Sequence, residues 1–149
     1  MLTPSTLFLV ANNAVLPFWL LLAFAPHHRV TRTLVHSMLG PAVFALLYLA
    51  LLIAGPFADP PPPNSGSFFS LEGVQTIFEN PWAALTAWVH YLAFDLFVGA
   101  WEVRDAKRHE VPHRYIVIPL FFTLMLGPVG LLLYLGVRRW SHGPIEAEP

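Results

Sequence analysis

The stretch PWAALTAWVHYLAFDLFVGAW, residues 81–101, indicates the fold class, because its 21 residues hold one charged side chain, Asp95. A helix needs about 20 mainly apolar residues to cross a hydrocarbon core about 30 Å thick. Unbroken apolar runs must be helical in lipid, which cannot satisfy backbone amides, and they lack the alternation of barrel strands. We therefore predict an all-α fold, a four-helix integral membrane bundle that forms a single domain over residues 1–149, with spans at residues 6–25, 34–53, 81–101 and 115–135.

The composition supports a membrane protein and excludes several other classes. Hydrophobic residues make up 56% of the 149 positions and charged residues 11%, against roughly 25% charged in soluble domains. The net charge of −1 provides no basic surface for a nucleic-acid partner. The absence of cysteine excludes disulfides, thiolate zinc sites and iron–sulfur clusters.

The connection at residues 54–80 divides into two parts of different character. Its first part, ADPPPPNSGS, is too rich in proline, glycine and serine to be helical, and we expect an extended surface loop. In the second part, Leu71, Val74 and Phe78 recur at helical spacing. This pattern predicts a short interfacial helix at about residues 70–79.

The basic residues suggest an orientation in the membrane. Six of the eight Lys and Arg residues lie between the first two spans or between the last two, and none lies at residues 54–80. The positive-inside rule then places both termini outside the cytoplasm. Because the N-terminus lacks a basic leader with a cleavage site, we expect an uncleaved protein of a bacterial inner membrane.

Asp95 is the most informative residue for function, because a carboxylate at the centre of a membrane helix costs about 2.5–3.5 kcal/mol on insertion scales. It belongs to a stripe on one helix face that leads from the membrane to the cytoplasmic end. His90 lies on the flank of this stripe. At 100° per residue, the stripe consists of Tyr91, Asp95, Val98, Glu102, Asp105 and His109.

Structural explanations compete with functional ones for these residues. Asp95 could bond the amides of Asn12 or Asn13 and so fix helix packing, and the residues beyond the span end could form a solvated face. Asp105, His109 and His113 have a spacing that suits metal ligands on one helix face. Pro112 is expected to end the helix before His113, however, and we predict no metal and no cofactor.

Several motifs resemble those of the neoxanthin-synthase-like family of membrane proteins. They are VLPFW at 15–19, SLEG at 70–73, GPVG at 127–130 and a pattern made of Trp88, His90, Asp95, Leu96, Phe97 and Asp105. In plants this family is needed to convert violaxanthin into neoxanthin, an isomerisation in which an epoxide opens and an allene forms. The resemblance implies a carotenoid or other polyene lipid as the partner of this chain.

The resemblance and the polar stripe together lead to three hypotheses. In the first, the protein isomerises a carotenoid epoxide with Asp95 as general acid and His90 as general base, while Glu102 and Asp105 relay protons. Ligand contacts are then expected from Trp88, Tyr91, Asn12, Asn13 and Asp105. In the second, it is a non-enzymatic pigment-binding or accessory subunit of a membrane or photosynthetic complex, or a homo-oligomer. In the third, the stripe forms a proton or ion pathway.

Overall fold

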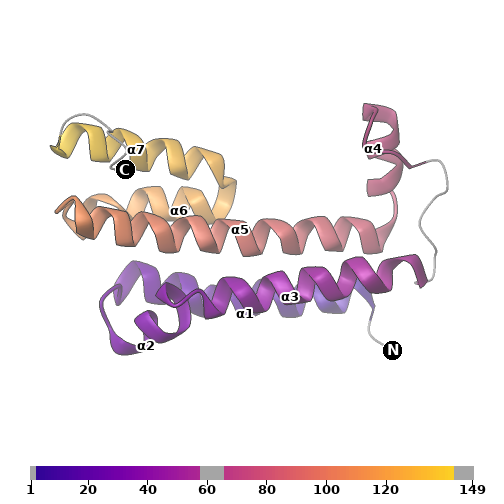
Figure 1. Ribbon diagram of the computed structural model, residues 1–149, viewed down its shortest axis with the longest axis horizontal. Coiled ribbons are helices and arrows are strands. Elements are labelled where there is room, and N and C mark those ends of the chain that lie inside the picture. Colours follow the sequence, from indigo (N-terminus) through magenta and orange to yellow (C-terminus); the bar gives the residue numbers. More distant parts are fainter. Residues whose placement is uncertain (1–2, 58–65, 143–149) are drawn as a thin grey trace.

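The computed structural model describes residues 3–57 and 66–142, and these contain helices but no strand (Figure 1). Most of the proline run that we expected to be extended, residues 58–65, lies outside the described residues. The α-helices are α1 (Pro4–Phe24), α2 (Arg29–Thr31), α3 (Leu39–Ala54), α4 (Leu71–Phe78), α5 (Pro81–Arg108), α6 (Val117–Leu126) and α7 (Pro128–His142). Shorter elements are the π-turn η1 (Arg32–His36) and the 3-10 turns η2 (Gly55–Phe57) and η3 (His113–Tyr115).

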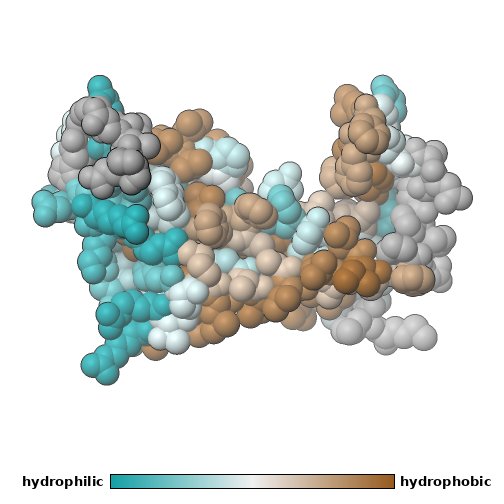
Figure 2. Space-filling view, in the orientation of Figure 1, coloured by the Kyte–Doolittle hydropathy of each residue, from teal (hydrophilic) through white to brown (hydrophobic). Residues whose placement is uncertain are grey.

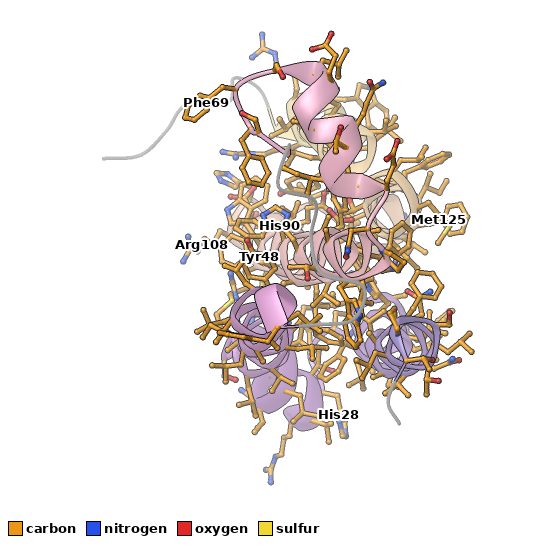
Figure 3. All side chains as sticks on the ribbon, turned by 90° about the vertical axis from the view of Figure 1, so that its right-hand side faces the viewer. His28, Tyr48, Phe69, His90, Arg108 and Met125 are labelled. Atoms are coloured by element: carbon orange, nitrogen blue, oxygen red, sulfur yellow. The ribbon has the colours of Figure 1, made fainter. Side chains whose placement is uncertain are left out.

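Three helical segments are long and apolar enough to cross a membrane: Pro4–Phe24, Arg29–Ala54 and Pro81–Arg108. They correspond to the first three predicted spans. Helix α5 is the central element, with α1 and α3 on one side of it and the pair α6–α7 on the other (Figures 1 and 3). The protein is therefore built around the helix that carries Asp95.

The core lies where α1, α3 and α6 pack against α5. Close approach is visible at Gly99 of α5, where an added Cβ would lie 2.7 Å from the Trp19 ring of α1. Large apolar side chains also cover much of the outer surface (Figure 2), as expected where lipid is the solvent. Fully buried core residues include Leu22, Val35, Val89, Leu96, Ala100 and Tyr134.

The fourth predicted span is wrong, because residues 115–135 form a helical hairpin. Helix α6 ends at Leu126, and Gly127 adopts φ +42° and ψ −91°, a conformation that L side chains rarely adopt. Pro128 then begins α7, which runs back along α6 (Figure 1). The two backbones touch, since a Cβ at Gly130 would lie 2.0 Å from the amide nitrogen of Thr123. Hydropathy identified the apolar length, but the turn divides it into two short helices.

The hairpin also changes the topology. Pro4 and His142, the outermost residues of α1 and α7, lie at opposite ends of the bundle (Figure 1). Both termini therefore cannot be outside the cytoplasm if the three long helices cross the membrane. We call the end that holds the α1–α3 connection, the C-terminus of α5 and the C-terminus of α7 the basic end. All eight Lys and Arg residues lie in these segments or, for Arg114, in η3 shortly after α5. They are Arg29, Arg32, Arg104, Lys107, Arg108, Arg114, Arg138 and Arg139.

Helix α4 agrees with the short helix predicted at residues 70–79. Ser70 caps it, since its Oγ accepts a hydrogen bond of 3.1 Å from the amide of Gly73. Its axis runs across that of α5 (Figure 1), the orientation of a helix in the membrane plane. Asn80 then caps α5, and its Oδ1 accepts from the amides of Trp82 and Ala83 at 2.9 and 3.2 Å.

Candidate functional site

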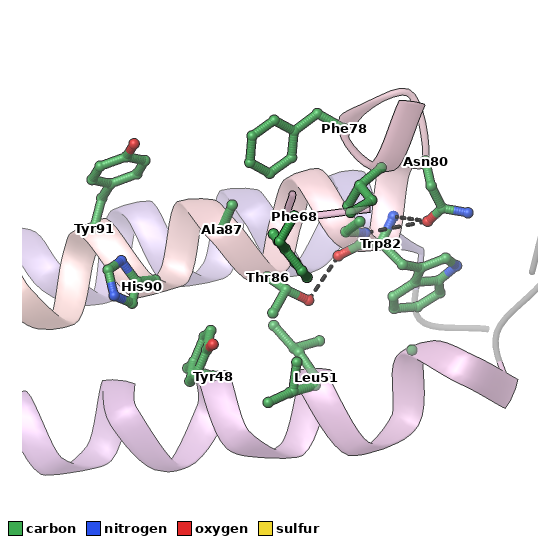
Figure 4. Close-up of a pocket in the computed structure, with 14 residues that line it drawn as sticks. Tyr48, Leu51, Phe68, Phe78, Asn80, Trp82, Thr86, Ala87, His90 and Tyr91 are labelled. Atoms are coloured by element: carbon green, nitrogen blue, oxygen red, sulfur yellow. Dashed lines mark hydrogen bonds between the residues drawn. The ribbon is translucent and has the colours of Figure 1, made fainter. Parts of the chain in front are cut away.

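A cavity of about 370 Å³ lies between α3, α4 and the N-terminal half of α5, and we call it the α4 pocket (Figure 4). This size falls in the range of small-molecule sites, about 300–1,000 Å³. Its lining is mainly apolar and aromatic, with a few polar tips. The lining residues are Tyr48, Leu51, Leu52, Gly55, Phe68, Ile77, Phe78, Asn80, Trp82, Ala83, Thr86, Ala87, His90 and Tyr91.

His90 supplies the basic side chain of the α4 pocket. Its ring lies among aromatic rings, with centroid distances of 4.6 Å to Phe94, 5.6 Å to Tyr48 and 6.0 Å to Tyr91. Figure 4 shows the His90 ring in the gap between α5 and α3. A neutral imidazole can both donate and accept a proton. The pocket thus combines apolar walls with one group suited to proton transfer.

Asp95 lies one helical turn beyond Tyr91, at the tip of the α6–α7 hairpin. A Cβ at Gly127 would lie 2.6 Å from Asp95 Oδ1, so the carboxylate touches the turn. Asp95 is half-buried, and no described residue makes a hydrogen bond or ion pair with it. A carboxylate close to the start of α7 also meets the positive end of that helix dipole.

The structure does not bring the predicted acid and base into contact. His90 packs toward Tyr48 of α3, whereas Asp95 contacts Gly127. Five residues on a helix correspond to a rise of about 7.5 Å and a rotation of about 140°. A substrate would have to reach both groups, because neither can act on the other directly.

The amides of Asn12 and Asn13 are not partners of Asp95. Asn12 Oδ1 accepts a hydrogen bond of 2.8 Å from Trp88 Nε1, and Asn13 Nδ2 donates to the Leu9 carbonyl at 2.7 Å. Both asparagines belong to α1, on the opposite side of α5 from the hairpin (Figure 1). The Asn12–Trp88 bond joins α1 to α5, whereas the Asn13 bond stays within α1, and neither asparagine lines the α4 pocket.

Glu102 is completely buried under the hairpin, which contradicts a solvated face at this position. Its Oε1 accepts a hydrogen bond of 2.9 Å from Thr123 Oγ1 of α6. Its Oε2 is buried and has no hydrogen-bond partner among the described residues. Sequence reasoning missed Thr123, since the apolar run at residues 115–135 offers no signal that it faces an acid.

Asp105 forms the centre of a buried polar cluster that ties α7 to α5. Tyr134 Oη donates to Asp105 Oδ2 at 2.5 Å, and Arg138 Nη1 lies 3.1 Å from the same oxygen. His109 Nε2 lies 3.6 Å from Oδ1. Oδ2 of Asp105 is thus engaged by α7 and Oδ1 faces His109 at the C-terminal end of α5, so its described contacts are within the bundle. Tyr134 and Arg138 were also missed, although their i, i+4 spacing places them on one helix face.

The three residues with metal-ligand spacing do not gather. His113 Nε2 lies 2.8 Å from the Ala23 carbonyl of α1, whereas His109 faces Asp105. In residues 3–57 and 66–142, no three His, Cys, Asp or Glu side chains are grouped to hold a metal ion. The polar face of α5 therefore carries carboxylates whose contacts are with the hairpin.

Comparison with known proteins gives one clear relationship. No solved structure matches the chain. Protein ABA DEFICIENT 4, chloroplastic, from Arabidopsis thaliana is 27% identical over 135 residues, which cover 86% of this chain. The matched region is 58% of that relative's length, so this chain spans a little over half of it. The model of the ABA DEFICIENT 4-like family matches residues 6–134, which include α1 to α6 and the start of α7. The chain belongs to the ABA DEFICIENT 4-like family.

Proposed function

We propose that this membrane protein binds a carotenoid by one ring-bearing end in the α4 pocket and isomerises its epoxide to an allene. The single observation that carries the proposal is His90 lining an apolar, aromatic pocket with its side chain exposed, and Asp95 five residues farther along the same helix. Membership of the ABA DEFICIENT 4-like family and the resemblance of the Trp88 to Asp105 motif to neoxanthin-synthase-like proteins support a carotenoid as the substrate.

The shape and chemistry of the α4 pocket suit such a ligand. A substituted cyclohexane ring requires apolar walls, and its oxygen requires a hydrogen-bond donor. Tyr48 and Tyr91 carry hydroxyls, whereas Thr86 Oγ1 is already bonded to the Trp82 carbonyl at 2.8 Å. The outer surface of the helices is apolar, so the polyene chain can remain in lipid while the ring enters the pocket.

The proposed reaction is balanced without an oxidant or reductant. One proton is donated to the epoxide oxygen as its carbon–oxygen bond breaks, which yields a hydroxyl. One proton is removed from a carbon of the adjacent polyene, and the electron pair of that C–H bond forms the new double bond of the allene. The formula is unchanged, so one acid and one base suffice. His90 and Asp95 take these roles, in whichever order the bound substrate dictates.

Turnover of an added carotenoid epoxide by purified variants tests this proposal. His90→Gln and Asp95→Asn keep size and much hydrogen-bonding capacity but remove proton transfer. We expect each to lower turnover at least about 100-fold, while both proteins still co-purify with carotenoid. His28→Gln, an exposed loop histidine, is the matched control and should keep full turnover.

Two results would contradict the enzyme proposal. Full turnover by both variants would show that neither group transfers the proton. Stoichiometric carotenoid in the purified protein without any turnover would instead favour a pigment-binding subunit. Carotenoid binding by the pocket-filling Ala87→Phe variant equal to that of wild type would remove the α4 pocket as the site.

A further inference from the structure

A second cavity, of about 360 Å³, lies at the basic end, and we call it the basic cavity. It is distinct from the α4 pocket, because its α5 residues lie at positions 103–107 and those of the α4 pocket at positions 82–91. The α1–α3 connection forms one wall and α5 forms the other. The lining residues are Pro26, His27, Arg32, His36, Ser37, Val103, Arg104 and Lys107.

The charge of the basic cavity is uncompensated. Arg32, Arg104 and Lys107 line it, and none of its lining residues is acidic. Among the described residues, the ion pairs all involve Asp105, whose partners are His109 and Arg138. Three cations that share a cavity without a carboxylate repel one another, so an anion would stabilise them.

The wall of the basic cavity is held in place by an irregular backbone. The π-turn at Arg32–His36 is followed by Met38 with φ +68°, a left-handed conformation, and π-turns often occur at functional sites. Arg104 Nη1 donates to the His36 carbonyl at 3.0 Å, and His36 Nε2 lies 2.9 Å from the Pro26 carbonyl. His36 Nδ1 is buried and has no hydrogen-bond partner among the described residues. Because Nε2 donates to a carbonyl, Nδ1 of the neutral ring is an acceptor, and the donors that an anion would meet are those of Arg32, Arg104 and Lys107.

An apolar groove of about 320 Å³ lies along the seam between α3 and α5, and we call it the seam groove. It neighbours the basic cavity, because the Sδ of Met38, which lines the groove, lies 3.9 Å from Nη1 of Arg104, which lines the cavity. The other residues that line the seam groove are Pro41, Ala42, Ala45, Ala93, Phe94 and Phe97.

From this arrangement we infer that the basic cavity and the seam groove together bind one anionic phospholipid, with its phosphate among Arg32, Arg104 and Lys107 and an acyl chain along α3 and α5. Cationic hollows between membrane helices at the headgroup level are suited to such headgroups. The neighbouring seam groove distinguishes a lipid from free phosphate, which would occupy the basic cavity alone. This site does not depend on the proposed reaction.

Native mass spectrometry of the full chain, titrated with phosphatidylglycerol or phosphatidylcholine, tests the inference. We expect phosphatidylglycerol to bind first and with one preferred copy. Lys107→Gln should weaken that binding about fivefold, the effect of one cation near an anionic headgroup. Arg108→Gln also removes one positive charge, but Arg108 does not line the basic cavity. This control should change the affinity for phosphatidylglycerol less than about twofold from that of wild type.

A second pair of variants tests the acyl chain. Ala45→Phe fills the seam groove without changing charge and should weaken phosphatidylglycerol binding, whereas Val43→Phe, exposed on α3 but outside the groove, should not. Equal binding of both lipids, or equal loss in Lys107→Gln and Arg108→Gln, would overturn the inference. Displacement of phosphatidylglycerol by excess inorganic phosphate, with no effect of Ala45→Phe, would assign the basic cavity to free phosphate instead.

Discussion

At the scale of single residues, burial separates the three carboxylates that the sequence places on one stripe. Asp95 is half-buried and touches the hairpin turn, Glu102 is completely buried against Thr123, and Asp105 pairs with Arg138 and Tyr134. Helical spacing shows that they share a face but does not show what covers it. Asp95, to which no described residue is hydrogen-bonded or ion-paired, is also the most exposed of the three carboxylates.

Asp105→Asn should destabilise the protein strongly. The change leaves Arg138, which is 8% exposed, as a buried cation without its partner, a loss that typically costs about 3–5 kcal/mol. Thermal unfolding in detergent measures this loss. Glu110→Gln, an exposed acid near the end of α5, is the control and should be nearly neutral.

A double variant separates the charge from other effects of this substitution. Asp105→Asn with Arg138→Met removes both charges, and it should recover part of the lost stability because no unpaired cation remains. If the double variant melts at the same temperature as Asp105→Asn alone, the ion pair is not what holds α7 to α5.

At the scale of elements, the hairpin is the feature that sequence reasoning missed. Residues 115–137 contain no charged residue, so hydropathy alone cannot divide them. The division depends on the backbone geometry at Gly127 and on the contact of Gly130 with Thr123. A hydropathy scale gives the same profile for two consecutive apolar helices as for one long apolar helix. The three long helices and α4 were predictable because length, capping residues and periodicity are local properties of the sequence.

Two glycines of α7 provide a matched test of the hairpin. Gly130→Ala should prevent the close contact, since its Cβ would lie 2.0 Å from the Thr123 nitrogen and 2.1 Å from Thr123 Oγ1. Gly136→Ala meets nothing within 4 Å and should be neutral or stabilising by up to about 1 kcal/mol, from helix propensity.

Detergent melting temperature and folded yield measure both changes. We expect a large loss for Gly130→Ala alone. Wild-type stability of Gly130→Ala would mean that α6 and α7 do not pack as a hairpin, and a long fourth span would again be the better description.

At the scale of the whole molecule, the N-terminus of α1 and the C-terminus of α7 lie at opposite ends of the bundle, because three long helices are followed by a hairpin. Every Lys and Arg lies at the basic end. This distribution is more one-sided than the sequence alone suggested, because a fourth span would have put Arg138 and Arg139 at the other end. The candidate site was predictable only in part. His90 and Asp95 came from the sequence, whereas helical periodicity does not show that α3, which is distant in the chain, and α4, which lies across α5, complete the walls of the α4 pocket.

Reporter fusions test this topology in a bacterial host. We expect a reporter that is active only in the cytoplasm to work when fused after Pro149 and to fail when fused before Met1, because the basic end should face the cytoplasm. A reporter that is active only outside the cytoplasm is the complementary control. Equal activity at both positions would exclude an odd number of spans.

The α6–α7 hairpin also affects how the chain is inserted into a bilayer during synthesis. A fourth span would require Arg138 and Arg139 to be carried through the hydrocarbon core, at about 2.5–3.5 kcal/mol for each arginine. Because α7 returns beside α6, neither arginine has to leave the side on which the hairpin enters. Insertion machinery then has to translocate only the N-terminal end of α1 and the segment between α3 and α5, neither of which contains a lysine or arginine.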